Sequence, residues 1–377
     1  MKAIVYEGML EGVRVADVAD PKLEQDDDIL LRITSTAICG SDLHLIHGMV
    51  PNMPAGFILG HEAMGIVKEA GREVTGVKKG DRVIVPFPVS CGHCWYCEHG
   101  LWSQCDNSNE NGEVGGILGY SDTYGGYDGG QAEYLRVPYA NVGPVAVPED
   151  LADEQVLFLT DILPTSLWGV ENAGVKAGDT VVVLGCGPVG QLAIQWAWIK
   201  GAKRVLAVDN IAYRLQHAHE HGKAEVFDFE QFDNMGEHLK EITHGGADAV
   251  VDCVGMDGKM TTLEKIETMM KLQGGSKSAI EIATQAVRKG GTVSLVGVYG
   301  ARYNMFPLGD FFARNITLKM GQCPAHSYVR PILKMIREGQ FDATGIITHT
   351  INLRDGAHAY DIFEKRKDNC IKVVLKP

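Results

Sequence analysis

Four of the nine cysteines of this chain stand in the stretch SCGHCWYCEHGLWSQC, residues 90–105. Cys91, Cys94, Cys97 and Cys105 form the pattern C-x2-C-x2-C-x7-C. Tetrahedral zinc accepts four thiolates, and two-residue gaps let a turn bring successive sulfurs to one ion. An iron–sulfur cluster or four unligated thiols are the alternatives. Because four sulfurs leave no coordination position open, we interpret this pattern as a structural zinc site that holds the loop 91–105.

Composition narrows the possible partners. The chain carries 48 acidic and 35 basic residues, a formal net charge of -13. This balance gives no electrostatic reason to bind nucleic acid or an anionic membrane. The first residues lack a basic region followed by an apolar one, and no apolar run is long enough to span a membrane. We therefore expect a cytoplasmic protein, where clustered cysteines more often bind metal than form disulfides.

The chain has 377 residues, a length that favours more than one domain. Its composition and hydrophobic pattern change along the sequence. Residues 1–154 are rich in Gly, Pro and short alternating apolar runs, which predict short strands and turns. Residues 155–300 contain the buried-strand patterns DTVVVLG, RVLAVD, ADAVVDCVG and GTVSLVGVYG with helical segments between them, which predict a parallel α/β sheet. Residues 301–377 return to mixed helix and strand.

One segment, residues 259–289, is longer than a single crossover helix requires. Leu263, Ile266, Met269 and Met270 recur there at helical spacing. Covering a face of the sheet is the expected role of this apolar stripe, because most such stripes pack in a core.

A glycine pattern follows the first strand of the predicted sheet. Gly185, Gly187 and Gly190 form G-x-G-x-x-G between a buried strand and a helix, the context that a dinucleotide site requires. Asp209 ends the next strand, 19 residues after Gly190, where its carboxylate would accept both ribose hydroxyls of NAD and repel the 2′-phosphate of NADP. Asn210 follows it, where an NADP site often has a basic residue. We expect contacts to NAD from the following residues: Gly185, Gly187, Pro188, Val189, Gly190 and Asp209.

A second set of possible metal ligands lies near the N-terminus. The segments CGSDLH, residues 39–44, and GHE, residues 60–62, supply Cys39, Ser41, His44, His61 and Glu62. Taken alone, each segment is weak, because a single buried Cys usually packs in the core and a single loop His is usually a satisfied polar residue.

Together with the cysteine run and the glycine pattern, these segments resemble the zinc-dependent medium-chain alcohol dehydrogenases over essentially the whole chain. The stretch GHEAMGIVKEAGREVTGVKKGDRVIV, residues 60–85, looks like that family's zinc signature. The segments SDLH, VSCGHCWYC, GGQAEYLRVPYA and LTDILPTSLWG look most like the glutathione-independent formaldehyde dehydrogenases and aldehyde dismutases. The resemblance implies a Rossmann doubly wound parallel sheet, a GroES-like mostly-β catalytic domain that residues 301–377 complete, and a homo-oligomer, a tetramer in our expectation.

The resemblance also implies site residues. Cys39, His61 and Asp161 would bind a catalytic zinc, with Glu62 as a fourth ligand or as a residue that orients the others; a helix N-cap is the alternative for Asp161. Ser41 and His44 would pass a proton outward, although His44 could instead only cap backbone. Thr165, Val296, Gly297 and Val298 would lie beside the nicotinamide and Lys372 near the pyrophosphate. Arg214 would flank the adenine or only solvate a helix face, and Gly40 offers no side chain where some members place Arg or His.

We therefore expect two zinc ions per chain, NAD, and hydride transfer between that cofactor and a small alcohol or an aldehyde hydrate, as in alcohol and formaldehyde dehydrogenases. A dismutase that keeps its NAD bound is a close alternative. A zinc-free quinone or enoyl reductase of the same superfamily would lack the cysteine run and the Cys39–His61 pair. A noncatalytic metal-stapled binding module is a third class. The aromatic candidates for the substrate pocket are Trp95, Trp168, Tyr299 and Phe306.

Overall fold

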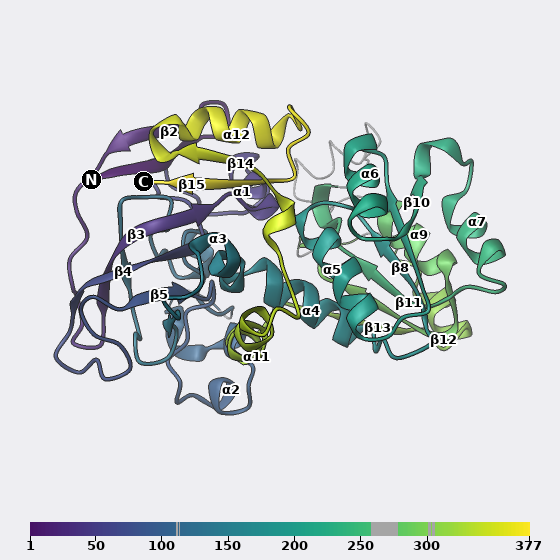
Figure 1. Ribbon diagram of the computed structural model, residues 1–377, viewed down its shortest axis with the longest axis horizontal. Coiled ribbons are helices and arrows are strands. Elements are labelled where there is room, and N and C mark those ends of the chain that lie inside the picture. Colours follow the sequence, from purple (N-terminus) through teal and green to yellow (C-terminus); the bar gives the residue numbers. More distant parts are fainter. Residues whose placement is uncertain (111, 113, 258–277, 301–302, 304–305) are drawn as a thin grey trace. The chain divides into compact units, whose positions relative to one another are not determined.

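The computed structural model of the chain describes residues 1–110, 112, 114–257, 278–300, 303 and 306–377 (Figure 1). It contains two compact units, one made of Met1–Pro164 with Cys323–Pro377 and the other of Thr165–Gln322. Both boundaries lie later than the expected residues 154 and 300. The helical turns at 153–160 pack against strands of the first unit, and the strand Thr317–Met320 still belongs to the sheet of the second.

The first unit is built on a mostly antiparallel sheet of seven strands in the order β14-β15-β3-β4-β5-β7, with β6 paired to β3. The strands β1 and β2 pair with each other as an antiparallel hairpin, which precedes this sheet in the sequence. Because β15 pairs with both β14 and β3, the C-terminal segment completes a sheet that the N-terminal segment begins. The strands are β1 (Lys2–Gly8), β2 (Gly12–Asp17), β3 (Ile29–Ala37), β4 (Glu62–Ala70), β5 (Arg82–Val85), β6 (Tyr134–Val137), β7 (Val145–Ala146), β14 (Ile347–Asn352) and β15 (Lys372–Lys376).

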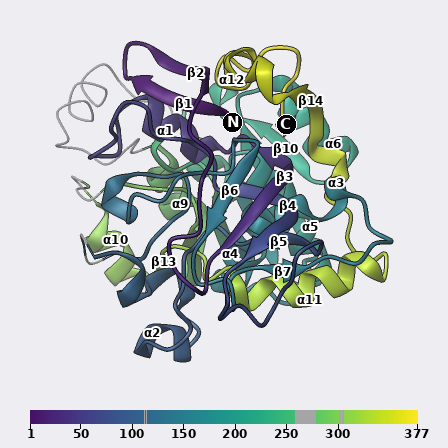
Figure 2. The same ribbon diagram turned by 90° about the vertical axis from the view of Figure 1, so that its left-hand side faces the viewer.

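Short helices connect these strands, and two longer ones come from the C-terminal segment (Figure 2). Alternating apolar residues of β3, β4 and β5 form the core of the unit, with Ile29, Leu31 and Val83 fully buried. The α-helices are α1 (Gly40–Ile46), α2 (Trp95–Glu98), α3 (Asp153–Val156), α11 (His326–Arg337) and α12 (Gly356–Glu364). The 3-10 helices are η1 (Trp102–Gln104), η2 (Asp106–Ser108), η3 (Asp122–Tyr124), η4 (Leu157–Thr160), η7 (Thr344–Ile346) and η8 (Leu353–Asp355). The helix α4 (Ile162–Asn172) begins in this unit and continues into the second.

The second unit is a doubly wound parallel sheet of six strands in the order β10-β9-β8-β11-β12-β13, which confirms the predicted fold class. Its central strands are almost wholly buried, as their Val-rich sequences predict. The strands are β8 (Thr180–Leu184), β9 (Arg204–Asp209), β10 (Glu225–Asp228), β11 (Ala247–Asp252), β12 (Val287–Leu295) and β13 (Thr317–Met320). The helices are α5 (Pro188–Ile199), α6 (Ala212–Glu220), α7 (Met235–Ile242), α9 (Ser278–Ala286), α10 (Leu308–Ala313), η5 (Phe229–Gln231) and η6 (Gly255–Asp257).

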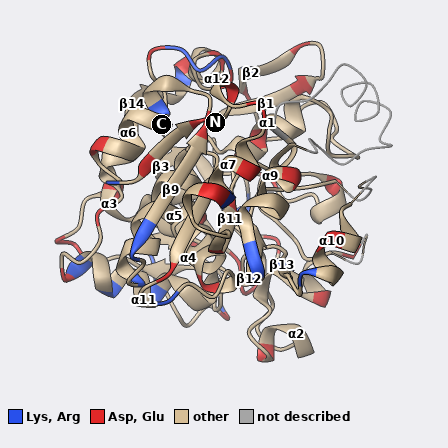
Figure 3. Ribbon diagram, turned by 90° about the vertical axis from the view of Figure 1, so that its right-hand side faces the viewer, with Lys and Arg blue, Asp and Glu red and all other residues tan. Residues whose placement is uncertain are grey.

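The expected helical stripe of Leu263, Ile266, Met269 and Met270 lies outside the described residues. The helix α9, which follows it, buries Ile280 and Ala283 in the core formed by the sheet. Acidic and basic residues are interspersed over the elements of the chain (Figure 3). Among the described residues, no helix has the length and apolar character that crossing a membrane requires.

Candidate active site and metal centres

The pairing of β3 with β4 brings the first two candidate ligands together. Ala37, the last residue of β3, is the partner of Glu62, the first residue of β4. Cys39 follows that end of β3 and is the residue before α1, and His61 immediately precedes β4. Side chains that are 22 positions apart in sequence therefore meet at one end of the ladder.

Asp161 completes this cluster from a distant part of the chain. It lies in the turn between η4 and α4, with its Oδ2 3.5 Å from Cys39 Sγ and 3.4 Å from His61 Nε2. Ligand atoms of Cys39, His61, Glu62 and Asp161 all lie within 4.8 Å of one another, and all four residues are buried. Ligands around a tetrahedral zinc are roughly 3.3–3.8 Å apart. The donors therefore fit zinc, and the direction of Oδ2 favours a ligand over a helix cap.

Glu62 and Lys372 form a buried ion pair beside this cluster. Both side chains are fully buried, and Lys372 Nζ donates to Glu62 Oε1 at 2.5 Å and to Ile38 O at 2.8 Å. Burial raises the pKa of Glu62 more than the Lys372 charge lowers it. The pairing of β15 with β3 places Val374 opposite Ala37, and Ile38 N donates to Val373 O at 3.2 Å, next to Lys372. Lys372 thus contacts the metal cluster, and its expected contact with the pyrophosphate stays a prediction.

The candidate proton-transfer residues both lie in α1. Ser41 Oγ is 3.4 Å from Cys39 Sγ and 3.2 Å from His61 Nε2, so the structure brings this hydroxyl to the ligands. His44 is buried one helical turn further along α1. Burial lowers the pKa of His61, but Asp42, Cys39 and Asp161 outweigh burial and raise it well above its usual value.

The four sulfurs of the cysteine run converge as their spacing predicts. Cys91, Cys94, Cys97 and Cys105 offer ligand atoms that lie within 4.8 Å of one another. The sulfurs of Cys94 and Cys105 are 3.9 Å apart, and all four thiols are free of disulfides. Burial opposes ionisation of Cys94, but hydrogen bonds from the Cys97 and Asp106 backbone lower its pKa to about 7. Four converging sulfur donors of this kind fit a structural zinc, which accepts four thiolates in its closed sites.

The glycine pattern adopts the expected strand–turn–helix geometry. Gly185, with φ +84°, directly follows β8, and α5 begins at Pro188. A Cβ at Gly190 would lie 1.8 Å from the carbonyl oxygen of Gly185, so a side chain cannot fit there. Asp209 Oδ2 accepts a hydrogen bond from Cys186 N at 2.7 Å, which holds this carboxylate against the glycine turn. The geometry is that of a dinucleotide-binding turn.

Other expected cofactor residues lie around the same sheet edge. A Cβ at Gly187 would lie 3.7 Å from a guanidinium nitrogen of Arg214, so Arg214 lies beside the glycine turn, which favours a binding role over solvation of a helix face. Val296 and Gly297 follow β12, and both donate backbone N–H groups to Asp252 O at 2.9 Å. A Cβ at Gly169 would lie 2.2 Å from Val296, so α4, the helix that carries Thr165, packs closely on this turn.

The four aromatic pocket candidates lie in different parts of the chain. Trp95 is 58% exposed and stacks on His99 within the cysteine loop. Tyr299 donates to Asp252 Oδ2 at 2.6 Å, Phe306 packs on Phe311, and Trp168 lies near Gly321. Those three belong to the second unit.

Two aromatic residues that sequence analysis missed lie at the metal cluster. The rings of Phe87 and Tyr120 stand edge-on to His61, with centroids 6.3 and 6.0 Å away. An isolated bridge between Pro88 and Ile117 brings their two segments together. No local pattern marks such a contact, because it depends on how two irregular segments pair.

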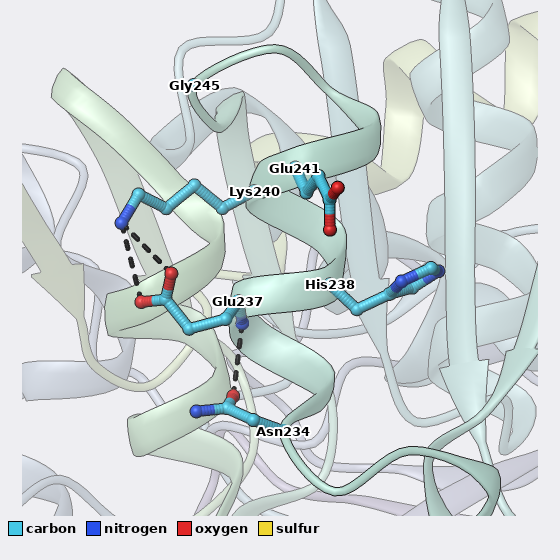
Figure 4. Close-up of a pocket in the computed structure, with 6 residues that line it drawn as sticks. All are labelled: Asn234, Glu237, His238, Lys240, Glu241 and Gly245. Atoms are coloured by element: carbon cyan, nitrogen blue, oxygen red, sulfur yellow. Dashed lines mark hydrogen bonds and ion pairs between the residues drawn. The ribbon is translucent and has the colours of Figure 1, made fainter.

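A separate hollow lies on α7 of the second unit (Figure 4). Lys240 pairs with Glu237 at 3.1 Å, and Asn234 Oδ1 accepts from Glu237 N at 3.0 Å. His238 stacks on Phe232, with centroids 4.2 Å apart. Glu237, Lys240 and Asn234 thus satisfy one another, and we assign no chemistry to this hollow.

Comparison with known proteins agrees with the geometry. Family models described as "Alcohol dehydrogenase GroES-like domain" and "Zinc-binding dehydrogenase" match residues 25–148 and 188–274. A zinc-type alcohol dehydrogenase-like protein, AdhB of Bacillus subtilis, is 54% identical over 379 residues, which cover 100% of both chains. The glutathione-independent formaldehyde dehydrogenase of Bacillus subtilis is 34% identical and covers 97% of this chain and 94% of its own.

A solved structure shows the same fold. The alcohol dehydrogenase TADH from Thermus sp. ATN1 superposes with a TM-score of 0.85 at 33% identity and covers 100% of this chain and 99% of its own. The chain belongs to the zinc-type medium-chain alcohol dehydrogenase family. Membership, with the two converging donor sets, removes the support for a zinc-free reductase.

Proposed function

We propose that this protein is a zinc-dependent oxidoreductase that transfers hydride between a small alcohol or aldehyde hydrate and NAD. The observation that carries the proposal is the buried convergence of Cys39, His61 and Asp161 with Glu62 beside them, in a chain of the zinc-type family. Zinc bound there would supply a Lewis acid that makes an alcohol proton easier to remove at neutral pH. The fourth donor of the cluster, Glu62, is already paired with Lys372. This pairing favours a fourth coordination position on the metal that a substrate can occupy.

The residues of α1 would carry the proton. Ser41 Oγ, 3.2 Å from His61 Nε2, is close enough to the ligands to accept a proton from a substrate hydroxyl. His44 follows one turn later and suits a base near neutral pH. Phe87 and Tyr120 would exclude water and limit the substrate to small molecules, because their rings fill the space next to His61.

The glycine turn and Asp209 support NAD as the hydride acceptor. The Asp209 carboxylate, held at the turn, would accept the ribose hydroxyls and repel a 2′-phosphate. Asp209→Gly should therefore reduce the preference for NAD over NADP by roughly 10-fold or more, because it removes both effects. The measurement is kcat/KM with each cofactor. An unchanged preference would show that another residue sets it.

The decisive experiment is a panel of short alcohols and aldehydes with both nicotinamides, run after the metal and coenzyme content of the purified protein have been measured. We expect about two zinc ions per chain and alcohol-dependent formation of NADH. Aldehyde turnover by retained coenzyme, without added NAD, would identify the dismutase alternative. One zinc per chain and no turnover on any substrate would leave a metal-stapled binding module instead.

We also propose that the protein is cytoplasmic and assembles as a homo-oligomer, a tetramer by family analogy. The free thiols support a reducing compartment. The edge strand β13 is largely exposed, and its residue Met320 is 58% exposed; Leu308 and Phe312, in the preceding helix α10, are 70% and 86% exposed. An exposed edge with apolar neighbours favours pairing with a second copy. Light scattering coupled to size exclusion measures the mass, and a monomer would contradict this assignment.

A further inference from the structure

A buried polar network continues from the candidate metal ligands to the C-terminal helix α12. Its centre is Asp42, which is fully buried two residues before His44 in α1. Asp42 Oδ2 accepts hydrogen bonds from Cys39 N and from Gln131 Nε2, both at 3.0 Å. Asp42 Oδ1 lies 3.1 Å from His61 Nδ1, an ion-pair distance without hydrogen-bond geometry. One carboxylate thus contacts the backbone of one candidate ligand and the ring of another.

Gln131 is locked in one orientation. Its side chain is fully buried, and Nε2 also donates to Ala37 O at 3.2 Å, while Oε1 accepts from the Tyr360 hydroxyl at 2.8 Å. A flipped amide would place its oxygen against a carboxylate and a carbonyl, so the two acceptors fix which end carries nitrogen. Tyr360, in α12, is itself 2% exposed.

The backbone also fixes Gln131 next to His61. Gln131 N donates to Leu59 O at 3.0 Å, and Gly130 N donates to Gly60 O at 2.8 Å. Gly60 has φ +102°, and a Cβ there would lie 2.4 Å from Gln131 Cγ. The Gln131 side chain therefore rests directly on the residue that precedes His61.

We propose that Gln131 and Tyr360 are positioning residues for the metal site, which rests on the function proposed above. Gln131 and Cys39 N occupy Asp42 Oδ2, so Oδ1 is left to face Nδ1 of His61. The negative charge of Oδ1, 3.1 Å away, favours the tautomer with the proton on Nδ1 and leaves the lone pair of Nε2 for the metal. Tyr360 holds Gln131 and thereby connects α12 to the orientation of His61.

The test measures the metal site directly. Cobalt(II) replaces zinc in the holoenzyme, and its visible absorption and the rate of its loss to a chelator are recorded for wild type, Tyr360→Phe and Gln131→Leu. Changing an outer partner of a metal ligand costs roughly 10–100-fold in metal affinity. We expect Gln131→Leu to fall in that range with a shifted spectrum, and Tyr360→Phe to lose several-fold with the same direction of shift.

Tyr127→Phe is the matched control. The Tyr127 hydroxyl donates one hydrogen bond to Ser108 O at 2.8 Å and belongs to the same unit. Tyr127→Phe therefore removes a hydrogen bond comparable to that of Tyr360, but one that is not connected to His61. The melting temperatures of the three variants are measured as well. The inference would be overturned if Tyr360→Phe and Gln131→Leu kept the cobalt spectrum and the metal-release rate of the wild type and, like Tyr127→Phe, changed only in melting temperature. Absence of metal from the Cys39–His61 cluster of the wild type would overturn the proposed function together with this inference.

Discussion

The two donor clusters of the first unit differ in how they are assembled. The cysteine cluster takes four identical donors from 15 consecutive positions, residues 91–105. The mixed cluster takes sulfur, nitrogen and oxygen donors from Cys39, His61, Glu62 and Asp161, which span 123 positions. A closed set of thiolates contributes mainly to folding, whereas a set with a weak or removable ligand leaves room for a substrate. In this protein, the cluster suited to chemistry therefore depends on tertiary structure, whereas the cluster that stabilises a loop depends on local sequence spacing.

Their surroundings differ in the same way. All members of the mixed cluster are buried, and Asp42, Gln131, Tyr360 and Lys372 around them are nearly or fully inaccessible to solvent. The cysteine cluster lies in a loop whose residue Trp95 is 58% exposed and whose Cys94 is half-buried. Water can therefore replace lost contacts around the cysteines more easily than around His61.

The largest expected effect comes from breaking the mixed cluster alone. Cys39→Ala should lower kcat/KM at least about 1,000-fold, because the Lewis acid contributes several kcal/mol to the reaction. The zinc content should fall from about two ions per chain to about one. NADH binding, measured by fluorescence titration, should stay intact, since the glycine turn belongs to the other unit.

Cys370→Ala serves as the control for that variant. Cys370 is fully buried in the same unit and belongs to neither cluster, so its loss should leave the zinc content unchanged. Normal turnover in Cys39→Ala would show that Cys39 is not part of the active site. Neither cluster would then have a demonstrated role in catalysis.

Breaking the other cluster should affect stability. Cys97 is 1% exposed, and Cys97→Ala should lower the free energy of unfolding by about 3 kcal/mol or more, because a structural metal contributes its binding energy to folding. Thermal unfolding and limited proteolysis of the loop 91–105 measure the effect. The folded fraction should keep one zinc. A melting temperature and protease resistance equal to wild type would mean that this cluster holds no metal.

The contrast also explains what the sequence could and could not reveal. The cysteine set and the glycine turn depend on spacing within one segment, so their geometry follows from local sequence. Cys39, His61 and Asp161 were identified only through family resemblance. Gln131 and Tyr360 are 89 and 229 positions from their partners in the network, and β pairing and the return of the C-terminal segment set those contacts. Tertiary contacts of this kind leave no periodic pattern.

A smaller effect should appear with pH where the cysteine loop meets α11. His326 stacks on Trp102, with centroids 5.2 Å apart, and both of its ring nitrogens are buried without a hydrogen-bond partner among the described residues. Burial lowers its pKa to about 4. The unfolded chain, with a pKa of about 6.5, takes up a proton at higher pH than the folded chain does, so stability is lost as pH falls from about 6.5 to 4.

His326→Phe removes this dependence while it keeps the ring stack. The difference in unfolding free energy between pH 7 and pH 5 should therefore be smaller in the variant than in wild type by about 2 kcal/mol. Urea unfolding at both pH values gives this difference. Parallel curves for the two proteins would show that His326 titrates as it does in solvent.

The smallest effect should come from a neighbour of the cysteine cluster. Asn107 Nδ2 donates to Cys91 Sγ at 3.2 Å, the counterpart of the support that Gln131 gives to Asp42. Asn107 is exposed, however, and water can take over its bond to the thiolate. Asn107→Ala should therefore lower the free energy of unfolding by about 0.5–1 kcal/mol and speed metal loss to a chelator only a few-fold. Metal loss from the cysteine cluster as fast as Gln131→Leu produces at the mixed cluster would show that burial does not set the strength of these outer contacts.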